Sequence, residues 1–130
     1  MSRGLLDTSV FIARESHHLD ATDLPDEVAV SVVTHAELSA GVLAATDLEV
    51  QARRLATLTA VTEMNPIPID LAIAEAWARI RVHLAQAQRR ANVNDMWIAA
   101  TAVALDVPVV TPDFDFDVMS ELVGLKVIRV

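Results

Sequence analysis

The 130-residue sequence contains no cysteine. This absence excludes disulfide bonds and thiolate-bound metal centres, and it agrees with the reducing cytoplasm. The chain also lacks a long apolar run, because the longest, residues 96–105, stops before Asp106 and Pro108, whereas about 20 residues are needed to cross a bilayer. The apolar stretch near the N-terminus is broken by Asp7, so we expect no secretory signal. These absences favour a soluble, cytoplasmic protein without a membrane segment.

Basic residues are scarce as well. The chain has 10 Lys and Arg residues against 18 Asp and Glu residues, a formal net charge of −8. Proteins that bind nucleic acid usually present a basic surface to the phosphates, so the net charge alone argues against this class. Six acids, however, lie in segments that we expect to converge, where bound cations would offset their charge. These six are Asp7, Glu37, Asp95, Asp113, Asp115 and Asp117.

No internal repeat, low-complexity tract or linker divides the sequence, so we expect one domain over residues 1–130. Short apolar runs predict strands at residues 4–6, 28–33, 107–111 and 125–130. Between them, the patterns predict helices from residue 9, over 34–45, 48–61 and 71–90, and from 92–95 to 105. The polar stretch 16–27 predicts a loop or short helix, and residues 66–70 a short extended piece. Helices that alternate with wholly apolar strands indicate an α/β fold with three layers, α/β/α, around a central, mainly parallel sheet.

Acidic residues follow the predicted strands. Asp7 comes directly after the first strand, and Glu37 lies in the first turn after the second. Asp113 and Asp115 follow the third, and Asp95 lies at the start of the helix before it. Because the carboxyl ends of parallel strands meet at one edge of a sheet, we expect these carboxylates to lie close together.

Each acid also has a structural interpretation. Thr34 and Glu37 have the spacing of a helix capping box, Asp7 can cap the helix after it, and Asp95 can complement the positive end of its helix. The acids after the third strand can be turn residues. For any single acid we prefer the structural interpretation. Together they indicate a site, because helix caps have no reason to cluster at one edge of a sheet.

The chemistry of such a cluster predicts a cation. Two carboxylates about 4 Å apart repel each other by roughly 4 kcal/mol at an effective dielectric constant near 20, so several of them need a cation or raised pKa values. An all-oxygen set suits Mg²⁺ or Mn²⁺ rather than zinc, and the four histidines share no ligand spacing. Such an ion activates water and stabilises charge on a phosphoryl oxygen. The cluster therefore predicts phosphodiester hydrolysis.

Four segments of the chain carry a family resemblance. They are LLDTSV at residues 5–10, SVVTHAEL at 31–38, NDMWIAAT at 94–101 and VTPDFDF at 110–116. They resemble the signature segments of PIN domains, in particular those of the VapC toxins of bacterial type II toxin–antitoxin pairs, and the resemblance covers essentially the whole chain. It implies an Mg²⁺- or Mn²⁺-dependent endoribonuclease that cuts RNA such as tRNA or rRNA and leaves 5′-phosphate and 3′-hydroxyl ends. It also implies a homodimer and inhibition by a small cognate antitoxin.

The resemblance assigns site residues one by one. Asp7, Glu37 and Asp95 match the metal-site acids of the family. For the fourth acid, Asp113 is preferred by its spacing from the end of the third strand. Asp115 stays open, because it precedes a phenylalanine as the final acid of the family does. We expect Asp117 to lie on the surface.

Supporting residues follow from the same resemblance. Hydroxyl side chains that hold carboxylates or waters in place are expected at Thr8, Ser9 and Thr111. Independently of the resemblance, the distribution of charge leads us to expect contacts to RNA phosphates from Arg14, Arg79 and Arg90; for Arg79 and Arg90 an ordinary solvated face is the alternative. The apolar side of the predicted helix 48–61, which includes Leu55, is expected to bind the antitoxin or a second subunit.

Rival classes fit the sequence less well. The segment that begins at Asp113 has Val118 and Gly124 where a calcium-binding EF-hand loop requires Gly and Glu. A receiver domain needs a second acid directly after the first strand, where Thr8 stands, and a haloacid-type phosphatase needs one at Ser9. The stronger alternative is a catalytically silent PIN-like binding module that acts through a complex with its antitoxin and operator DNA. The sequence keeps all four acids, which favours the enzyme.

Overall fold

The structure is a computed structural model that describes residues 2–130. The described strands are β1 (Arg3–Leu6), β2 (Glu27–Val30), β3 (Val109–Thr111) and β4 (Val127–Arg129). The described helices are α1 (Thr8–Glu15), α2 (Val32–Ala44), α3 (Leu48–Glu63), α4 (Leu71–Gln86), α5 (Val93–Leu105) and α6 (Asp117–Val123), with a short 3-10 helix, η1, at Ala21–Asp23. Within residues 2–130, no helix is both long enough and apolar enough to cross a membrane.

The four strands form one parallel sheet in the order β2-β1-β3-β4. Leu5 pairs with Ala29 on one side and with Val109 on the other, and Val109 pairs in turn with Val127. All four strands therefore end at the same edge of the sheet. This arrangement confirms the predicted parallel sheet.

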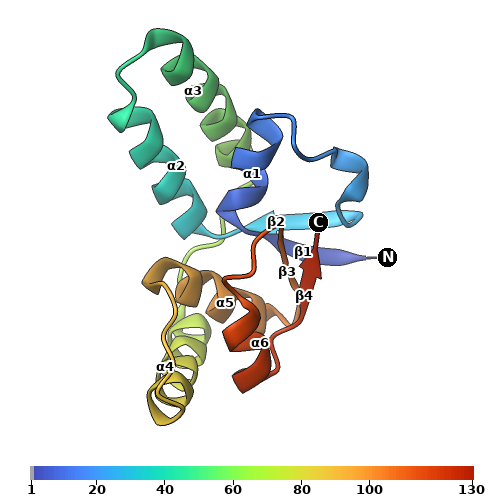
Figure 1. The fold of residues 1–130 in the computed structure, drawn as a ribbon, viewed down its shortest axis with the longest axis vertical. Helices are drawn as coiled ribbons and strands as arrows, with labels where there is room; N and C mark the ends of the chain where they lie inside the picture. Colours follow the sequence, from blue (N-terminus) through green and yellow to red (C-terminus); the bar gives the residue numbers. More distant parts are fainter. Residues whose placement is uncertain (1) are drawn as a thin grey trace.

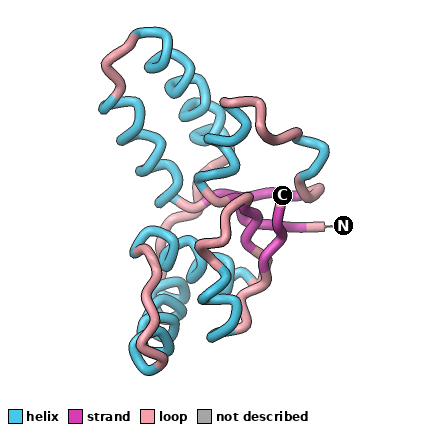
Figure 2. Tube along the Cα trace, viewed as in Figure 1, coloured by secondary structure: helices cyan, strands magenta, loops and turns pink. Residues whose placement is uncertain are grey.

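Helices cover both faces of the sheet (Figure 1). Leu5 and Val109 point into a core shared with α4, α5 and α6, whereas Leu6 and Val110 point into a second core shared with α1, α2 and α3. Figure 2 shows the strands in magenta between these two groups of cyan helices. Strands buried on both faces need apolar residues at successive positions, which explains the uninterrupted apolar runs. The predicted three-layer α/β/α fold is confirmed.

Several element bounds differ from the prediction for local reasons. α2 begins at Val32 rather than at residue 34, because the Ser31 side chain caps it by accepting from the backbone N–H of Val33. α4 ends at Gln86 rather than at residue 90, and Gln88 adopts a positive φ of 55°, which breaks a right-handed helix. β2, β3 and β4 are shorter than predicted, whereas β1 begins one residue earlier, at Arg3; α6 is absent from the prediction. Its seven residues are too few to show a helical period clearly.

Candidate active site

A pocket of about 470 Å³ opens where the strands end. Its lining includes five acids from four segments that are distant in sequence. They are Asp7, Glu37, Asp95, Asp113 and Asp115. One of the described residues that line the pocket, Arg90, is basic. The predicted acids therefore meet in one place, and their combined charge far exceeds that of the single guanidinium.

Asp7 lies between β1 and α1 and is almost fully buried, with 4% of its surface exposed. Its Oδ1 accepts a hydrogen bond from the backbone N–H of Thr8 at 2.8 Å, so Asp7 is also the N-cap of α1. Its Oδ2 accepts hydrogen bonds from the hydroxyls of Ser9 and Thr111, the latter at 3.1 Å. The structural interpretation of Asp7 as a helix cap is correct. The same three donors also fix its carboxylate at the pocket.

Thr111 links two of the acidic segments through one hydroxyl group. Its side chain is fully buried at the end of β3. The hydroxyl donates to Asp7 and accepts a hydrogen bond from the backbone N–H of Asp113 at 3.0 Å. The start of the segment that carries Asp113 and Asp115 is thereby tied to the first acid.

Glu37 is held by a chain of two threonines. The Thr8 Oγ1 lies 2.8 Å from Glu37 Oε1 and 3.0 Å from the Oγ1 of the buried Thr34. A hydroxyl has one proton, so Thr8 donates to the Glu37 carboxylate and accepts from Thr34. The capping-box interpretation of Thr34 and Glu37 is wrong, because α2 is capped at Ser31. Thr34 is a supporting residue that the sequence analysis missed, although it lies one helical turn before Glu37.

Asp95 lies half-buried in the first turn of α5, whose N-cap is Asn92. Burial raises the pKa of the Asp95 carboxyl to about 7, and the nearby carboxylates add to the shift in the order Asp7, Asp115, Glu37 and Asp113. Burial also raises the pKa of Asp7, although its hydrogen bonds act in the opposite direction. Both shifts have the same causes. Burial disfavours the charged form of each carboxylate, and repulsion from neighbouring carboxylates adds to both shifts.

The donor set of the pocket fits a hard divalent cation. All five acids offer oxygen atoms, which Mg²⁺ and Mn²⁺ prefer, and the uncompensated charge favours a cation. Within residues 2–130, no three acidic or histidine side chains form a preassembled metal cluster. Mg²⁺ does not need one, because it binds through one or two carboxylates and keeps several water ligands.

Residues 4–122 match the sequence model of the PIN domain. The chain belongs to the PIN-domain family. Ribonuclease VapC5 of Mycobacterium tuberculosis is 50% identical over 128 residues, which are 98% of this chain and 95% of that protein. Ribonuclease VapC4 of the same organism is 44% identical over 125 residues, 92% of this chain and 93% of that protein. The predicted resemblance to VapC toxins is thereby confirmed.

Solved structures agree with this PIN-domain assignment. The crystal structure of VapBC-5 from Mycobacterium tuberculosis, a member of the VapBC family of toxin–antitoxin systems, contains a chain that is 48% identical. That chain has a TM-score of 0.90, with 100% of both chains covered. A DNA-bound VapBC structure from Salmonella typhimurium shares the fold at 20% identity, with a TM-score of 0.81 and 99% and 98% of the two chains covered.

The three arginines that were expected to contact RNA lie in different places of this PIN domain. Arg90 lines the acidic pocket. Arg14 lines a separate hollow with His17 and His18 at the end of α1. Arg79 is exposed on α4 and is not part of the pocket lining. The structure therefore brings one of the three to the acids.

Proposed function

We propose that this PIN domain is a divalent-metal-dependent endoribonuclease and the toxin of a type II toxin–antitoxin pair. The observation that carries the proposal is the acidic pocket, in which burial and mutual repulsion raise the pKa values of Asp7 and Asp95. The names of the relatives, ribonucleases at 50% and 44% identity, support the same activity. Clustered carboxylates with perturbed pKa values in a concave site are typical of catalytic centres.

The proposed mechanism assigns a task to each residue. Asp7, Glu37 and Asp95, with Asp113 or Asp115, would hold one or two Mg²⁺ or Mn²⁺ ions. When bound, such an ion offsets the carboxylate charge and stabilises negative charge on the phosphoryl group. Water adds to the phosphorus, the bond from phosphorus to the 3′ oxygen breaks, and that oxygen takes up a proton. The products carry a 5′ phosphate and a 3′ hydroxyl.

The remaining lining residues position these groups. Thr8, Ser9 and Thr111 orient the carboxylates of Asp7 and Glu37 by donating hydrogen bonds to them. Arg90, the cationic residue of the described lining, is suited to a phosphate oxygen of the RNA. Through these contacts the chain fixes the geometry before the substrate binds, which is the main contribution of a protein to phosphoryl chemistry.

The proposed function is tested on total cellular RNA. Purified protein, free of any antitoxin, is incubated with Mg²⁺ or Mn²⁺, and new 5′ ends are mapped by sequencing. We expect metal-dependent ends confined to one or a few tRNA or rRNA positions. The absence of new ends with either metal, from protein shown to be folded, would contradict the proposal and favour the silent binding module.

The hydroxyl chain behind Glu37 provides a second test. Replacing Thr34 by Val keeps the shape of the side chain but removes the hydroxyl group that donates a hydrogen bond to Thr8. We expect the turnover rate to fall about tenfold, the cost of losing roughly 1.4 kcal/mol of hydrogen bonding at the site, and we expect Thr34→Ser to restore it. Thr101→Val is the matched control, because this buried threonine donates to the Trp97 carbonyl, away from the pocket. Equal losses of activity for both valine variants would assign Thr34 a structural role only.

We also propose that the chain works in the cytoplasm with a cognate antitoxin and as a homodimer. α2 and α3 form an arm that projects from the sheet (Figure 1). Three of its leucines expose large apolar surfaces, with exposed fractions of 84% at Leu43, 80% at Leu48 and 50% at Leu55. Exposed apolar patches of this kind mark protein interaction sites.

The arm is tested by a single polar substitution. We expect Leu55→Gln to weaken binding of the antitoxin that co-purifies with the chain, or self-association, at least about tenfold, or roughly 1.4 kcal/mol. Val82→Gln on α4 is the control, since Val82 is equally exposed, at 51%. Binding is measured by titration calorimetry and self-association by sedimentation velocity. An unchanged affinity and an unchanged oligomeric state would place both interfaces elsewhere.

A further inference from the structure

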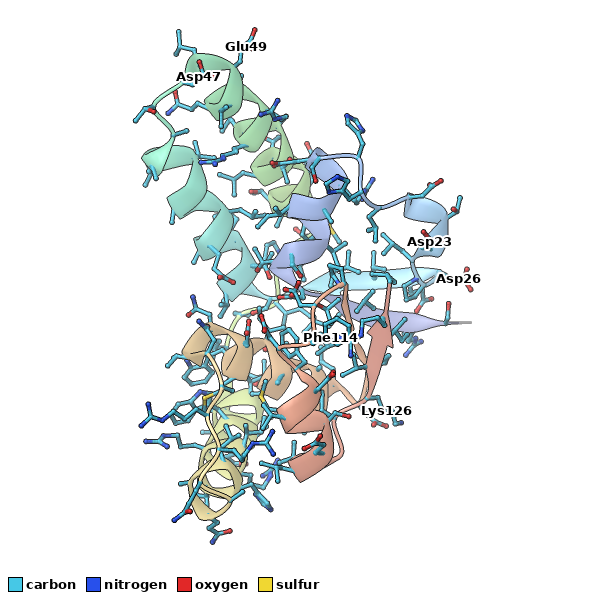
Figure 3. The ribbon with its side chains drawn as sticks, viewed as in Figure 1. Asp23, Asp26, Asp47, Glu49, Phe114 and Lys126 are labelled. Carbon is cyan, nitrogen blue, oxygen red and sulfur yellow. The ribbon has the colours of Figure 1, made fainter. Side chains whose placement is uncertain are left out.

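An exposed aromatic ring lies on the segment that carries two of the pocket acids, although the ring itself is not part of the described pocket lining. Phe114 has 74% of its surface exposed, and the residues on either side of it, Asp113 and Asp115, both line the pocket. In Figure 3 it is labelled on the segment that leads from β3 into α6. Covering exposed apolar surface is favourable, so a ligand that packs on this ring beside the acids would gain affinity.

The other aromatic side chains of residues 2–130 have packing roles. Phe11 and Phe116 are buried, with exposed fractions of 6% and 0%. Trp77 and Trp97 stack on each other with ring centroids 4.9 Å apart, and both pack against the core formed by α4 and α5. Phe114 is thus the aromatic side chain in the described part of the chain that remains available for a ligand.

Arg129 packs against one face of the Phe114 ring and holds the ring in place. The guanidinium carbon of Arg129 lies 4.3 Å from the ring centroid, and the same guanidinium forms an ion pair with Asp117. The backbone N–H of Asp117 donates to the Phe114 carbonyl at 3.1 Å, which closes the turn. Arg129 pairs with Thr111 in the sheet register. The ring is therefore anchored to the end of the sheet, and since one face lies against Arg129, its exposed surface is the other face and the edges.

We propose that the open face of Phe114 stacks against an unpaired nucleobase next to the phosphate that is cut. The proposal rests on the ribonuclease function proposed above. Stacking of a base on an aromatic side chain strengthens binding by about five- to 150-fold and does not depend on charge. A chain with a net charge of −8 and a single arginine among the described pocket residues needs such a contact, because counterion release can supply little of its affinity for RNA.

The surroundings of the ring favour a base over a protein side chain. Asp113 and Asp115 flank Phe114 with charge, whereas an apolar protein contact would extend over neighbouring apolar residues, as on the arm formed by α2 and α3. A ring backed by a guanidinium and bordered by polar groups suits a flat, amphipathic base. The substrate would accordingly be a loop or single strand whose base can leave its own stack.

The test measures binding separately from cleavage. A fluorescein-labelled single-stranded RNA oligonucleotide of mixed sequence is titrated, by fluorescence anisotropy in Mg²⁺, against the Asp7→Asn variant with Phe, Ala, Leu or Trp at position 114. We expect Ala and Leu to weaken binding about tenfold, within the range of a lost stacking contact, and Trp to retain it. The weakening should be the same at about 50 and 200 mM salt, since stacking involves no counterions. Leu71→Ala, at a side chain 76% exposed on α4, is the control and should change nothing.

A second experiment identifies the nucleotide whose base stacks on Phe114. RNAs with one abasic nucleotide at each position are combined with the Phe114→Ala variant in a double-mutant cycle. We expect coupling at one position only, adjacent to the cleavage site. If the forms with Phe and with Ala at position 114 bound RNA equally tightly, the proposed stacking on Phe114 would be wrong, even if the wild-type chain cuts RNA. Failure of both forms to bind, in a chain that also yields no new RNA ends, would overturn the proposed function as well. Weakened antitoxin binding with unchanged RNA binding would show that Phe114 is a protein contact instead.

Discussion

Replacement of Asp7 by Asn is expected to lower the rate of RNA cleavage at least about a hundredfold, or roughly 2.7 kcal/mol of transition-state stabilisation. Asp7 is the most buried of the five acids that line the pocket, and three hydrogen bonds fix its carboxylate. Asn has nearly the same shape, but it lacks the negative charge that a divalent cation requires. The measurement is the single-turnover rate on the RNA identified by end mapping.

The fold should tolerate this change. The Asn side-chain oxygen can still accept from the backbone N–H of Thr8 and cap α1, and the hydroxyls of Ser9 and Thr111 can rotate to accept from the new amide group. Asp106→Asn serves as the control, because it removes one negative charge outside the described pocket lining, at a residue whose positive φ of 54° suits Asn. A cleavage rate for Asp7→Asn within threefold of wild type would show that the site has been assigned wrongly.

The second large effect is on stability, and it depends on pH. The pKa of Asp95 is about 7 in the folded chain, against an ordinary value of 3.8. Between these two values the folded state binds a proton more tightly than the unfolded state, so this group lowers the free energy of unfolding as the pH rises. A shift of this size corresponds to at most about 4 kcal/mol. Asp95→Asn, which cannot ionise, should therefore stabilise the chain above pH 7 by up to that amount, and the gain should vanish below about pH 4.

Urea unfolding of wild type and Asp95→Asn at about pH 4 and pH 8 checks this prediction. The urea unfolding curves are measured at each pH with a chelator and again with Mg²⁺. We expect added Mg²⁺ to shrink the gain at pH 8, because a bound cation stabilises the ionised wild-type carboxylate and does little for the amide. A gain of equal size at both pH values would mean that packing, rather than charge, causes the effect.

The five acids of the pocket could be predicted because one rule covers them all. Each lies shortly after a strand end or in the first two turns of a helix, with Glu37 in the second turn of α2, and in a parallel sheet these positions meet at one edge. Asp113 and Asp115 could not be separated by sequence, and the structure shows why both matter electrostatically. The charge of Asp113 raises the pKa of Asp7, whereas Asp115 contributes more than Asp113 to the shift at Asp95.

Other features depend on contacts that no local pattern encodes. The role of Thr34 depends on where α2 is capped. Both Ser31 and Thr34 are good N-cap residues, and Ser31 is the cap because β2 ends at Val30, directly before it. The support of Phe114 by Arg129 joins residues that become neighbours only through the pairing of β3 with β4. The helix face that Arg79 occupies likewise follows from the packing of α4, and it leaves this side chain exposed and outside the pocket lining.

The order of the strands also has a consequence for the chain while it is being made. Asp7 stands near the beginning of the sequence, and it receives its hydrogen bond from Thr111, which is 104 residues further along. While residues 109–130 are still inside the ribosome, the emerged part of the chain contains the residues of β1 and β2 but not those of β3 and β4. It also lacks two of the five acids. At that stage the acidic pocket lacks β3, Thr111 and these two acids, so it forms only after that segment has emerged.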